Sequence, residues 1–178
     1  MKSKYIITLK AEDRPGLLHL VTGVLNKKLV PIISLNAAST DIHDIVLITM
    51  EVEIAENATL PLLAKLKNII EVFEVEALSY TKASSLRAAY FLLDRAALAS
   101  SAKPAIQKSG AVIANIYPKA VLVAKYGSDA DIRALYNELE GPHLLGFSQT
   151  GLIADSKLIG QSEEEQSSVI RKAAKIAA

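Results

Sequence analysis

The stretch Glu12-Asp13-Arg14-Pro15-Gly16-Leu17-Leu18 decides the fold, because it separates two different hydrophobic periods. Before it, residues 4–11 alternate between apolar and polar and are rich in β-branched side chains, which predicts a strand. After it, apolar residues recur at helical spacing, which predicts a helix over residues 16–28. Pro15 suits a first helical position, where its missing N–H costs nothing. Gly16 has no side chain, so a ligand could closely approach the N–H groups of the new helix.

The turn therefore predicts a small-anion site, because a helix N-terminus attracts negative charge and a free carboxylate would fit there. Asp13 would accept hydrogen bonds from an ammonium group of the same ligand. Leu17, Leu18 and Ile32 would line the site with an apolar wall. A tight strand–helix turn without a ligand explains the same residues, and both interpretations stay open. The first of them predicts a protein that senses a small acid rather than one that transforms it.

The composition excludes several classes of function. The chain has 178 residues, 51% of them hydrophobic and 22% charged, as in soluble globular proteins. Its net charge of +1 argues against a general nucleic-acid binder. There is no Cys, so disulfides and thiolate chemistry are excluded. We see no signal peptide and no apolar run of the roughly 18 residues that a membrane helix needs, so we expect a cytoplasmic protein with no membrane contact.

The first half of the chain predicts six elements in the order βαββαβ. Polar turns and breaks in the hydrophobic period separate them, and Pro31 suits the start or the edge of its strand. The strands are expected at residues 4–11, 30–39, 44–54 and 71–80, and the helices at 16–28 and 58–69.

The second half repeats this order after the small polar stretch 81–85, where we place the domain boundary. Within its first helix Pro104 predicts a kink or break, and Gly110 suits the C-cap. Ser128 or Asp129 suits the N-cap of its second helix. The strands are expected at 86–93, 112–116, 120–126 and 144–153, and the helices at 95–109 and 128–139.

The fold class predicted is α+β, with two ferredoxin-like βαββαβ domains and a C-terminal helix. The domains are expected at residues 1–80 and 86–157, joined by the linker 81–85. Residues 158–178 are expected to form an amphipathic helical extension that begins with a capping-box pattern at 162–165. That helix would pack on its own chain or on a sister subunit, and a frayed tail is the alternative.

The sequence contains none of the common catalytic patterns. His19, His43 and His143 are not at metal-ligand spacing. No nucleophile elbow, Walker loop or dinucleotide fingerprint is present. Acidic residues on the strands, such as Glu51 and Glu53, are interpreted as the solvated face of a sheet. We therefore predict no enzyme activity, no catalytic residue and no metal. An enzyme with an unrecognised site would show turnover by the isolated chain.

The strand, the Asp13 to Leu18 turn, the helix and the later Pro31-Ile32-Ile33-Ser34-Leu35 strand together resemble the ACT domain, a small regulatory module that binds amino acids. The resemblance implies an effector site formed by the eight residues Asp13, Arg14, Pro15, Gly16, Leu17, Leu18, Pro31 and Ile32. It also implies that two such domains pair edge to edge and bind the effector between them.

The second half of the chain indicates which kind of ACT-domain protein the sequence resembles. Residues 109–118, then 121–127, then Phe147-Ser148-Gln149-Thr150-Gly151 are similar to the C-terminal half of the regulatory small subunit of acetolactate synthase. The resemblance covers residues 4–155 and implies a subunit without catalysis of its own. Such a subunit binds and activates the catalytic large subunit and makes it sensitive to valine or a related branched-chain amino acid. No cofactor is expected in this chain; thiamine diphosphate, Mg and FAD are expected in the catalytic partner.

The chain also departs from that family at several positions. When the family's motif is matched to this sequence, Asp13 occupies the position of an effector-contacting Asn, and Gly16 occupies the position of the loop Gly. Pro31 replaces an amide side chain and offers no N–H. Gln149 and Asn115 stand where the family has Arg and Asp. These departures imply that valine sensitivity is weak, altered or absent, even where the fold and the assembly role hold. A free-standing ACT-type amino-acid sensor that controls another enzyme or a transcription factor is the alternative.

Overall fold

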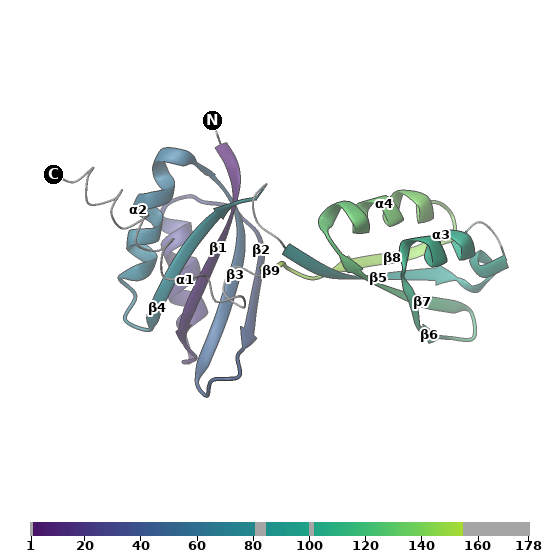
Figure 1. Cartoon of the computed structure of the whole chain (residues 1–178), viewed down its shortest axis with the longest axis horizontal. Coiled ribbons are helices and arrows are strands. Elements are labelled where there is room, and N and C mark those ends of the chain that lie inside the picture. The colour runs from purple at the N-terminus through teal and green to yellow at the C-terminus, as the bar shows by residue number, and fades with distance from the viewer. Residues whose placement is uncertain (1, 81–84, 100–101, 155–178) are drawn as a thin grey trace.

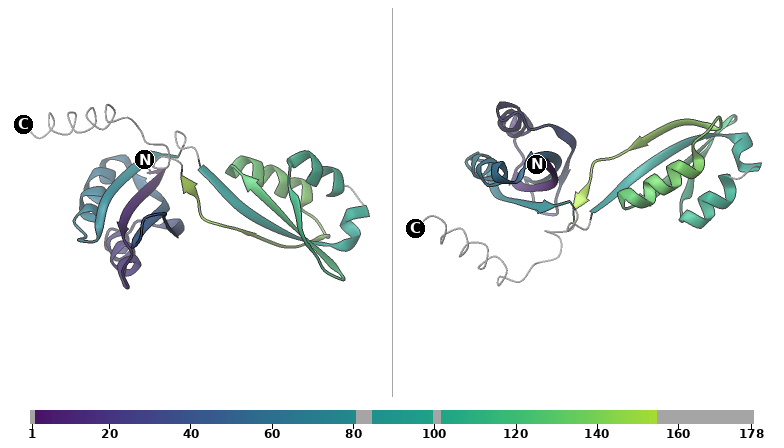
Figure 2. Two further views of the ribbon diagram at one scale, coloured as in Figure 1. Left: turned by 60° about the horizontal axis from the view of Figure 1, so that its bottom comes forward. Right: turned by 90° about the horizontal axis from the view of Figure 1, so that it is seen from above.

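The computed structural model describes residues 2–80, 85–99 and 102–154. Most of the expected linker and the whole expected C-terminal helix, residues 158–178, lie outside the described residues. The described chain forms two lobes side by side along an elongated molecule, and each lobe is a sheet with helices on one face (Figure 1). Two further views show the same separation of the lobes (Figure 2).

The first lobe has the predicted βαββαβ order. Its sheet has the strand order β2-β3-β1-β4, so β2 and β4 form its edges. β1 pairs antiparallel with both β3 and β4. The elements are β1 (Lys2–Glu12), α1 (Leu17–Lys27), β2 (Ile32–Ser39), β3 (Ile45–Ala55), α2 (Glu56–Lys67) and β4 (Val72–Ser79).

The core of this lobe follows from the two hydrophobic periods. Alternate residues of β1 and β3 point to one face of the sheet, where Leu9 and Met50 are fully buried. The apolar stripe of α1 places Val21 and Leu25 against that face. The opposite face of the sheet is turned away from both helices.

The second lobe repeats the order and confirms a ferredoxin-like unit. Its sheet has the strand order β6-β7-β5-β8, and β9 pairs with the start of β5. Phe91 of the inner strand β5 and Ile132 of α4 are buried in its core. The elements are β5 (Ser85–Asp94), a 3-10 turn (Arg95–Ala99), α3 (Ala102–Ser109), β6 (Val112–Ile116), β7 (Ala120–Gly127), α4 (Asp129–Leu139), β8 (Leu144–Gln149) and β9 (Ile153–Ala154).

Two expected elements of the second lobe differ from the structure. The single helix over 95–109 is wrong in its first part, because residues 95–99 form a 3-10 helix and α3 begins at Ala102. Pro104 lies in the first turn of α3, where its missing N–H is tolerated, so it does not kink the helix. The single strand over 144–153 is also wrong. β8 ends at Gln149, and Gly151 and Leu152 contact the first lobe before β9 pairs with the start of β5.

Both expected caps are present. Gly110 adopts a φ of +70° after α3, and the N–H of Ala111 donates to the carbonyl of Ile106, which makes a Schellman motif. Ser128 caps α4 in a reciprocal capping box with Asp131. None of the helices in the described part of the chain combines the length and apolar character needed to cross a bilayer.

Candidate functional site

The turn between β1 and α1 is a type II β-turn. The N–H of Leu17 donates to the carbonyl of Arg14 at 3.1 Å, and Gly16 sits at the third turn position with φ 91° and ψ −10°. Pro15 is at the second turn position, and α1 begins at Leu17. The prediction that Pro15 occupies the first helical position is therefore wrong. The proline fits because this turn type favours it there, and the glycine is required by its positive φ.

The side chains of this turn point in different directions. Leu17 is 3% exposed and packs in the core, whereas Leu18 is 43% exposed. Asp13 is exposed, and its backbone N–H donates to the carbonyl of Asp44 at 2.8 Å. Arg14 pairs with Glu12 at 2.7 Å on the surface. The hydrogen bond and the charge of Glu12 raise the pKa of Arg14, so the guanidinium stays charged.

Gly16, as the N-cap residue, provides no side-chain hydrogen bond to the first turn of α1. The helix N-terminus thus has the open character that the sequence predicts. However, the structure does not gather the eight predicted residues into one cavity. The turn residues lie at one end of α1, and Pro31 and Ile32 lie beyond its other end.

A pocket of about 410 Å³ lies between α1 and β2. Of the eight predicted site residues, Ile32 lines it, and Pro31 is its exposed neighbour in sequence. The other lining residues are His19, Thr22, Gly23, Asn26 and Val30. Four of these form a stripe on α1 at spacings of three and four residues. That polar and small-residue stripe is the sequence signal that would have indicated this face of the helix.

The pocket can hold a small polar molecule with an apolar part. His19 and Asn26 provide donors and acceptors, while Val30 and Ile32 provide apolar surface. Thr22 is already engaged, because its hydroxyl donates to the carbonyl of Leu18 at 2.6 Å. The wall at β2 is formed by an edge strand, which among the described strands pairs with β3 alone. An edge strand of a second copy could therefore extend the site.

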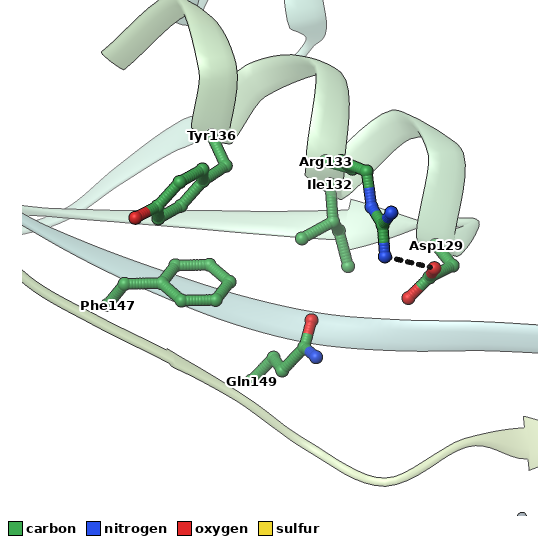
Figure 3. Close-up of a pocket in the computed structure, with 6 residues that line it drawn as sticks. All are labelled: Asp129, Ile132, Arg133, Tyr136, Phe147 and Gln149. Atoms are coloured by element: carbon green, nitrogen blue, oxygen red, sulfur yellow. Dashed lines mark ion pairs between the residues drawn. The ribbon is translucent and has the colours of Figure 1, made fainter. Parts of the chain in front are cut away.

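A second pocket, of about 310 Å³, lies between α4 and β8 in the other lobe. Phe147 and Tyr136 form its aromatic wall with ring centroids 4.9 Å apart. Arg133 and Asp129 lie on its rim, joined by an ion pair of 3.6 Å, with Gln149 facing them (Figure 3). The remaining lining residue is Ile132. None of these was among the predicted site residues.

The three histidines lie on separate elements or turns. His19 lines the first pocket, and His43 pairs with Asp44 on the surface. The backbone carbonyl of His143 accepts a hydrogen bond from Asp94. Within the described residues no cluster of three or more His, Asp or Glu side chains could hold a metal ion.

The two lobes contact each other across the helix-free face of the first sheet. Leu152 is fully buried there against Ile6 and Tyr80. Gly151 lies so close to β2 that an added Cβ would be 3.2 Å from the carbonyl carbon and oxygen of Leu35. Gly151 and Leu152, which lie between β8 and β9, thus form part of the contact between the lobes. The Phe147–Gly151 motif of the sequence includes Gly151, but it did not predict that this residue contacts the first lobe.

Comparisons with known proteins agree with this fold. The model of the ACT domain family matches residues 4–76. The acetolactate synthase small subunit from Thermotoga maritima has a TM-score of 0.78 at 12% sequence identity, over 85% of this chain and 95% of that chain. The comparison with curated proteins gives no significant match.

Two further solved structures are similar over parts of the chain. The ACT domain from GTP pyrophosphokinase of Chlorobium tepidum is 25% identical, over 44% of this chain and 100% of that chain, with a TM-score of 0.39. The regulatory subunit of aspartate kinase from Thermus thermophilus is 17% identical, over 78% of this chain and 94% of that chain, with a TM-score of 0.42. Residues 4–76 match the ACT domain family and have its βαββαβ order, so we call the first lobe the ACT domain, and the two-domain fold of the chain is similar to that of the Thermotoga small subunit.

Proposed function

We propose that this chain is a non-catalytic regulatory subunit of acetolactate synthase. It would activate the catalytic large subunit and confer feedback control by a valine-like branched-chain amino acid bound between two ACT domains. The observation that carries the proposal is the two-domain fold, shared over 85% of this chain and 95% of the Thermotoga small subunit. The match extends beyond the ACT domain to the second lobe, whose sequence motifs resemble the same family.

The pocket beside β2 supports the effector part of the proposal. Val30 and Ile32 offer the apolar wall that a branched aliphatic side chain needs, and Asn26 and His19 offer polar partners for its charged groups. The pocket opens at an edge strand, so pairing of two copies through β2 would bring two such pockets together. Coupling between an effector and a distant partner is typically worth about 1–3 kcal/mol, which corresponds to roughly 5- to 150-fold in affinity.

The test is co-purification with the catalytic subunit of the same organism, followed by an assay of acetolactate formation. We expect the chain to bind that subunit and raise its rate, and we expect valine to reduce the raised rate. No binding together with an unchanged rate would refute the proposal.

A matched pair of variants tests where the effector binds. Gly23→Val puts a branched side chain into the pocket, and nothing lies within 4 Å of the Cβ position to block it. We expect this variant to activate the catalytic subunit normally but to lose its response to valine. Ala64→Val, at an exposed position of α2, is the control and keeps both properties. A Gly23→Val subunit with an undiminished valine response would place the effector elsewhere.

The second candidate is a free-standing amino-acid sensor that controls another enzyme or a transcription factor. Pro31 favours it, because this exposed residue next to the pocket has no N–H and no amide to offer an effector. A thermal-shift screen against the twenty amino acids separates the two candidates. Stabilisation by an amino acid outside the branched-chain group, and by none within it, would favour the free-standing sensor.

A further inference from the structure

A buried ion cluster joins the two domains. Arg87 belongs to β5 of the second domain, yet it is 6% exposed because its side chain reaches the ACT sheet. Its Nη2 donates to Oε2 of Glu51 in β3 at 2.7 Å. Its Nε lies 3.2 Å from Oδ1 of Asp129, the first residue of α4. We call Glu51, Arg87 and Asp129 the interdomain clamp.

On the ACT side the clamp reaches the strand that lines the effector pocket. Glu51 is 1% exposed, so its interpretation as part of a solvated sheet face is wrong. In the sheet register Glu51 lies opposite Ser34 of β2, whose hydroxyl donates to the same Oε2 at 3.3 Å. Ser34 is separated from the pocket residue Ile32 by an irregularity in the β2–β3 pairing. A shift of β2 at the pocket would therefore move a hydrogen-bond partner of the clamp.

On the other side the clamp holds two elements of the second domain. Asp129 begins α4 and also lines the second pocket, where it pairs with Arg133. Nη1 of Arg87 donates to the carbonyl of Thr150 at 3.4 Å, in the segment that seats Gly151 against β2. One guanidinium thus contacts β3 of the ACT domain, the first turn of α4 and the segment that follows β8.

The electrostatics favour a fixed arrangement of these groups. Burial lowers the pKa of Arg87, but hydrogen bonds with Glu51 and Tyr80 and the charges of Glu51 and Asp129 outweigh it and raise that pKa. Arg87 therefore remains charged at any physiological pH. Lys4 approaches the other oxygen of Glu51 at 3.8 Å but is half exposed. A buried carboxylate deprived of Arg87 would be left without its closest cation, which disfavours any domain arrangement that separates the pair.

We infer that Arg87 is a positioning residue that fixes the second domain on the ACT sheet and carries a displacement of β2 to the first turn of α4. The inference deepens the proposed regulatory role, and it rests on that role only for the direction in which the signal travels. The clamp itself is a property of the free chain. It can therefore be tested without an effector or a catalytic partner.

The first experiment measures the distance between the domains. The chain has no Cys, so Lys65→Cys on α2 and Glu138→Cys on α4 introduce two unique and exposed sites for spin labels. We expect a single narrow distance distribution with the clamp intact. The double variant Glu51→Gln/Arg87→Met removes both charges, so no unpaired charge stays buried, and we expect it to fold with a broadened distribution. A distribution as narrow as that of the intact chain would overturn the inference.

The matched control is Arg14→Met, which removes an exposed ion pair with Glu12 inside the ACT domain. We expect its distance distribution to equal that of the intact chain. Equal broadening by Arg14→Met and by the clamp variant would show a general loss of order and would also overturn the inference. Dispersed amide resonances in each variant establish that both domains remain folded.

The second experiment follows the displacement from β2 to α4. Ser34→Ala removes the hydroxyl that touches Glu51, and we expect the amide resonances of Ala130 and Asp131 in α4 to shift. Combined with Glu51→Gln/Arg87→Met, the same Ser34→Ala change should leave those resonances where the double variant has them. Shifts that persist without the clamp, or that are absent when the clamp is intact, would refute transmission through Arg87. Because no effector is added, failure here is distinguishable from failure of the proposed function.

Discussion

At the scale of single residues, the glycine that precedes α1 and the glycine within it have opposite effects on stability. Gly16 is held at a φ of 91° by the type II turn, whereas Gly23 lies within the helix, and neither has an atom within 4 Å of its Cβ position. We expect Gly16→Ala to lower the free energy of unfolding by about 1–2 kcal/mol, because an L side chain is strained there. Gly23→Ala should raise it by up to about 1 kcal/mol.

Urea denaturation of the two variants measures both changes. Since the surroundings are open at both sites, the backbone conformation is the difference between them, and each variant serves as the control for the other. Equal effects of the two substitutions would contradict the assignment of the turn.

Leu29 is a second residue whose backbone conformation decides its effect on the stability of the protein. It follows α1 with a φ of 53°, and the N–H of Val30 closes a Schellman motif on Leu25. Its side chain is 86% exposed, so little packing opposes its removal. We expect Leu29→Gly to stabilise the protein by about 1 kcal/mol through relief of left-handed strain, as measured by thermal unfolding. The control Leu60→Gly, at an exposed helical position of α2, should instead destabilise it by about 1 kcal/mol.

At the scale of elements, α4 depends on its capping box. The Ser128 hydroxyl accepts from the N–H of Asp131, and the Asp131 carboxylate accepts from the N–H of Ser128 at 3.0 Å. We expect Ser128→Ala to lower the free energy of unfolding by about 1 kcal/mol at neutral pH. Asp41→Ala, in an exposed turn, is the control and should have little effect.

The same capping box predicts that the stability of the protein depends on pH. The hydrogen bonds from the Ser128 side chain and backbone lower the pKa of Asp131 in the folded state. Its contribution is therefore fully present above the pKa of an unfolded Asp, about 3.9, and is lost as the pH falls through the lower folded value. The stability difference between the native chain and Asp131→Ala should shrink below about pH 4 in unfolding curves recorded across that range. A constant difference would show that the carboxylate is not the group that acts.

At the scale of the whole molecule, the seat of the second domain on the ACT sheet depends on Gly151. An added Cβ would lie 3.1 Å from Cβ of Asn36 and 3.2 Å from the backbone of Leu35, so the strand or the segment must move. We expect Gly151→Ala to destabilise the protein by about 1–3 kcal/mol and to increase its radius of gyration in X-ray scattering. Gly146→Ala is the control, because its Cβ would meet Leu92 at an ordinary 3.8 Å. An unchanged radius of gyration for Gly151→Ala would contradict this prediction, because it would show that the contact between Gly151 and β2 accommodates the added methyl group.

The sequence predicted both folds of the chain because each rests on local information. Alternation along β1 and β3 and helical spacing along α1 assign the elements, and the order βαββαβ leaves few topologies. The errors lie where local rules allow two outcomes. Pro15 fits the first turn of a helix and the second position of a type II turn equally well, and the hydrogen bond from Leu17 to Arg14 distinguishes them. Similarly, the apolar period over 144–153 continues through Leu152, although that side chain serves the other domain.

The sequence by itself determined the two ferredoxin-like units, the ACT resemblance and the open helix start at Gly16, because these depend on residues near one another in the chain. Tertiary structure decided the pocket beside β2, which needs α1 next to that strand, and the burial of Glu51. A strand period tells which sheet face a carboxylate occupies but not what covers that face. Here Arg87, 36 residues further along the chain, covers it and turns an apparently solvated acid into half of a buried ion pair.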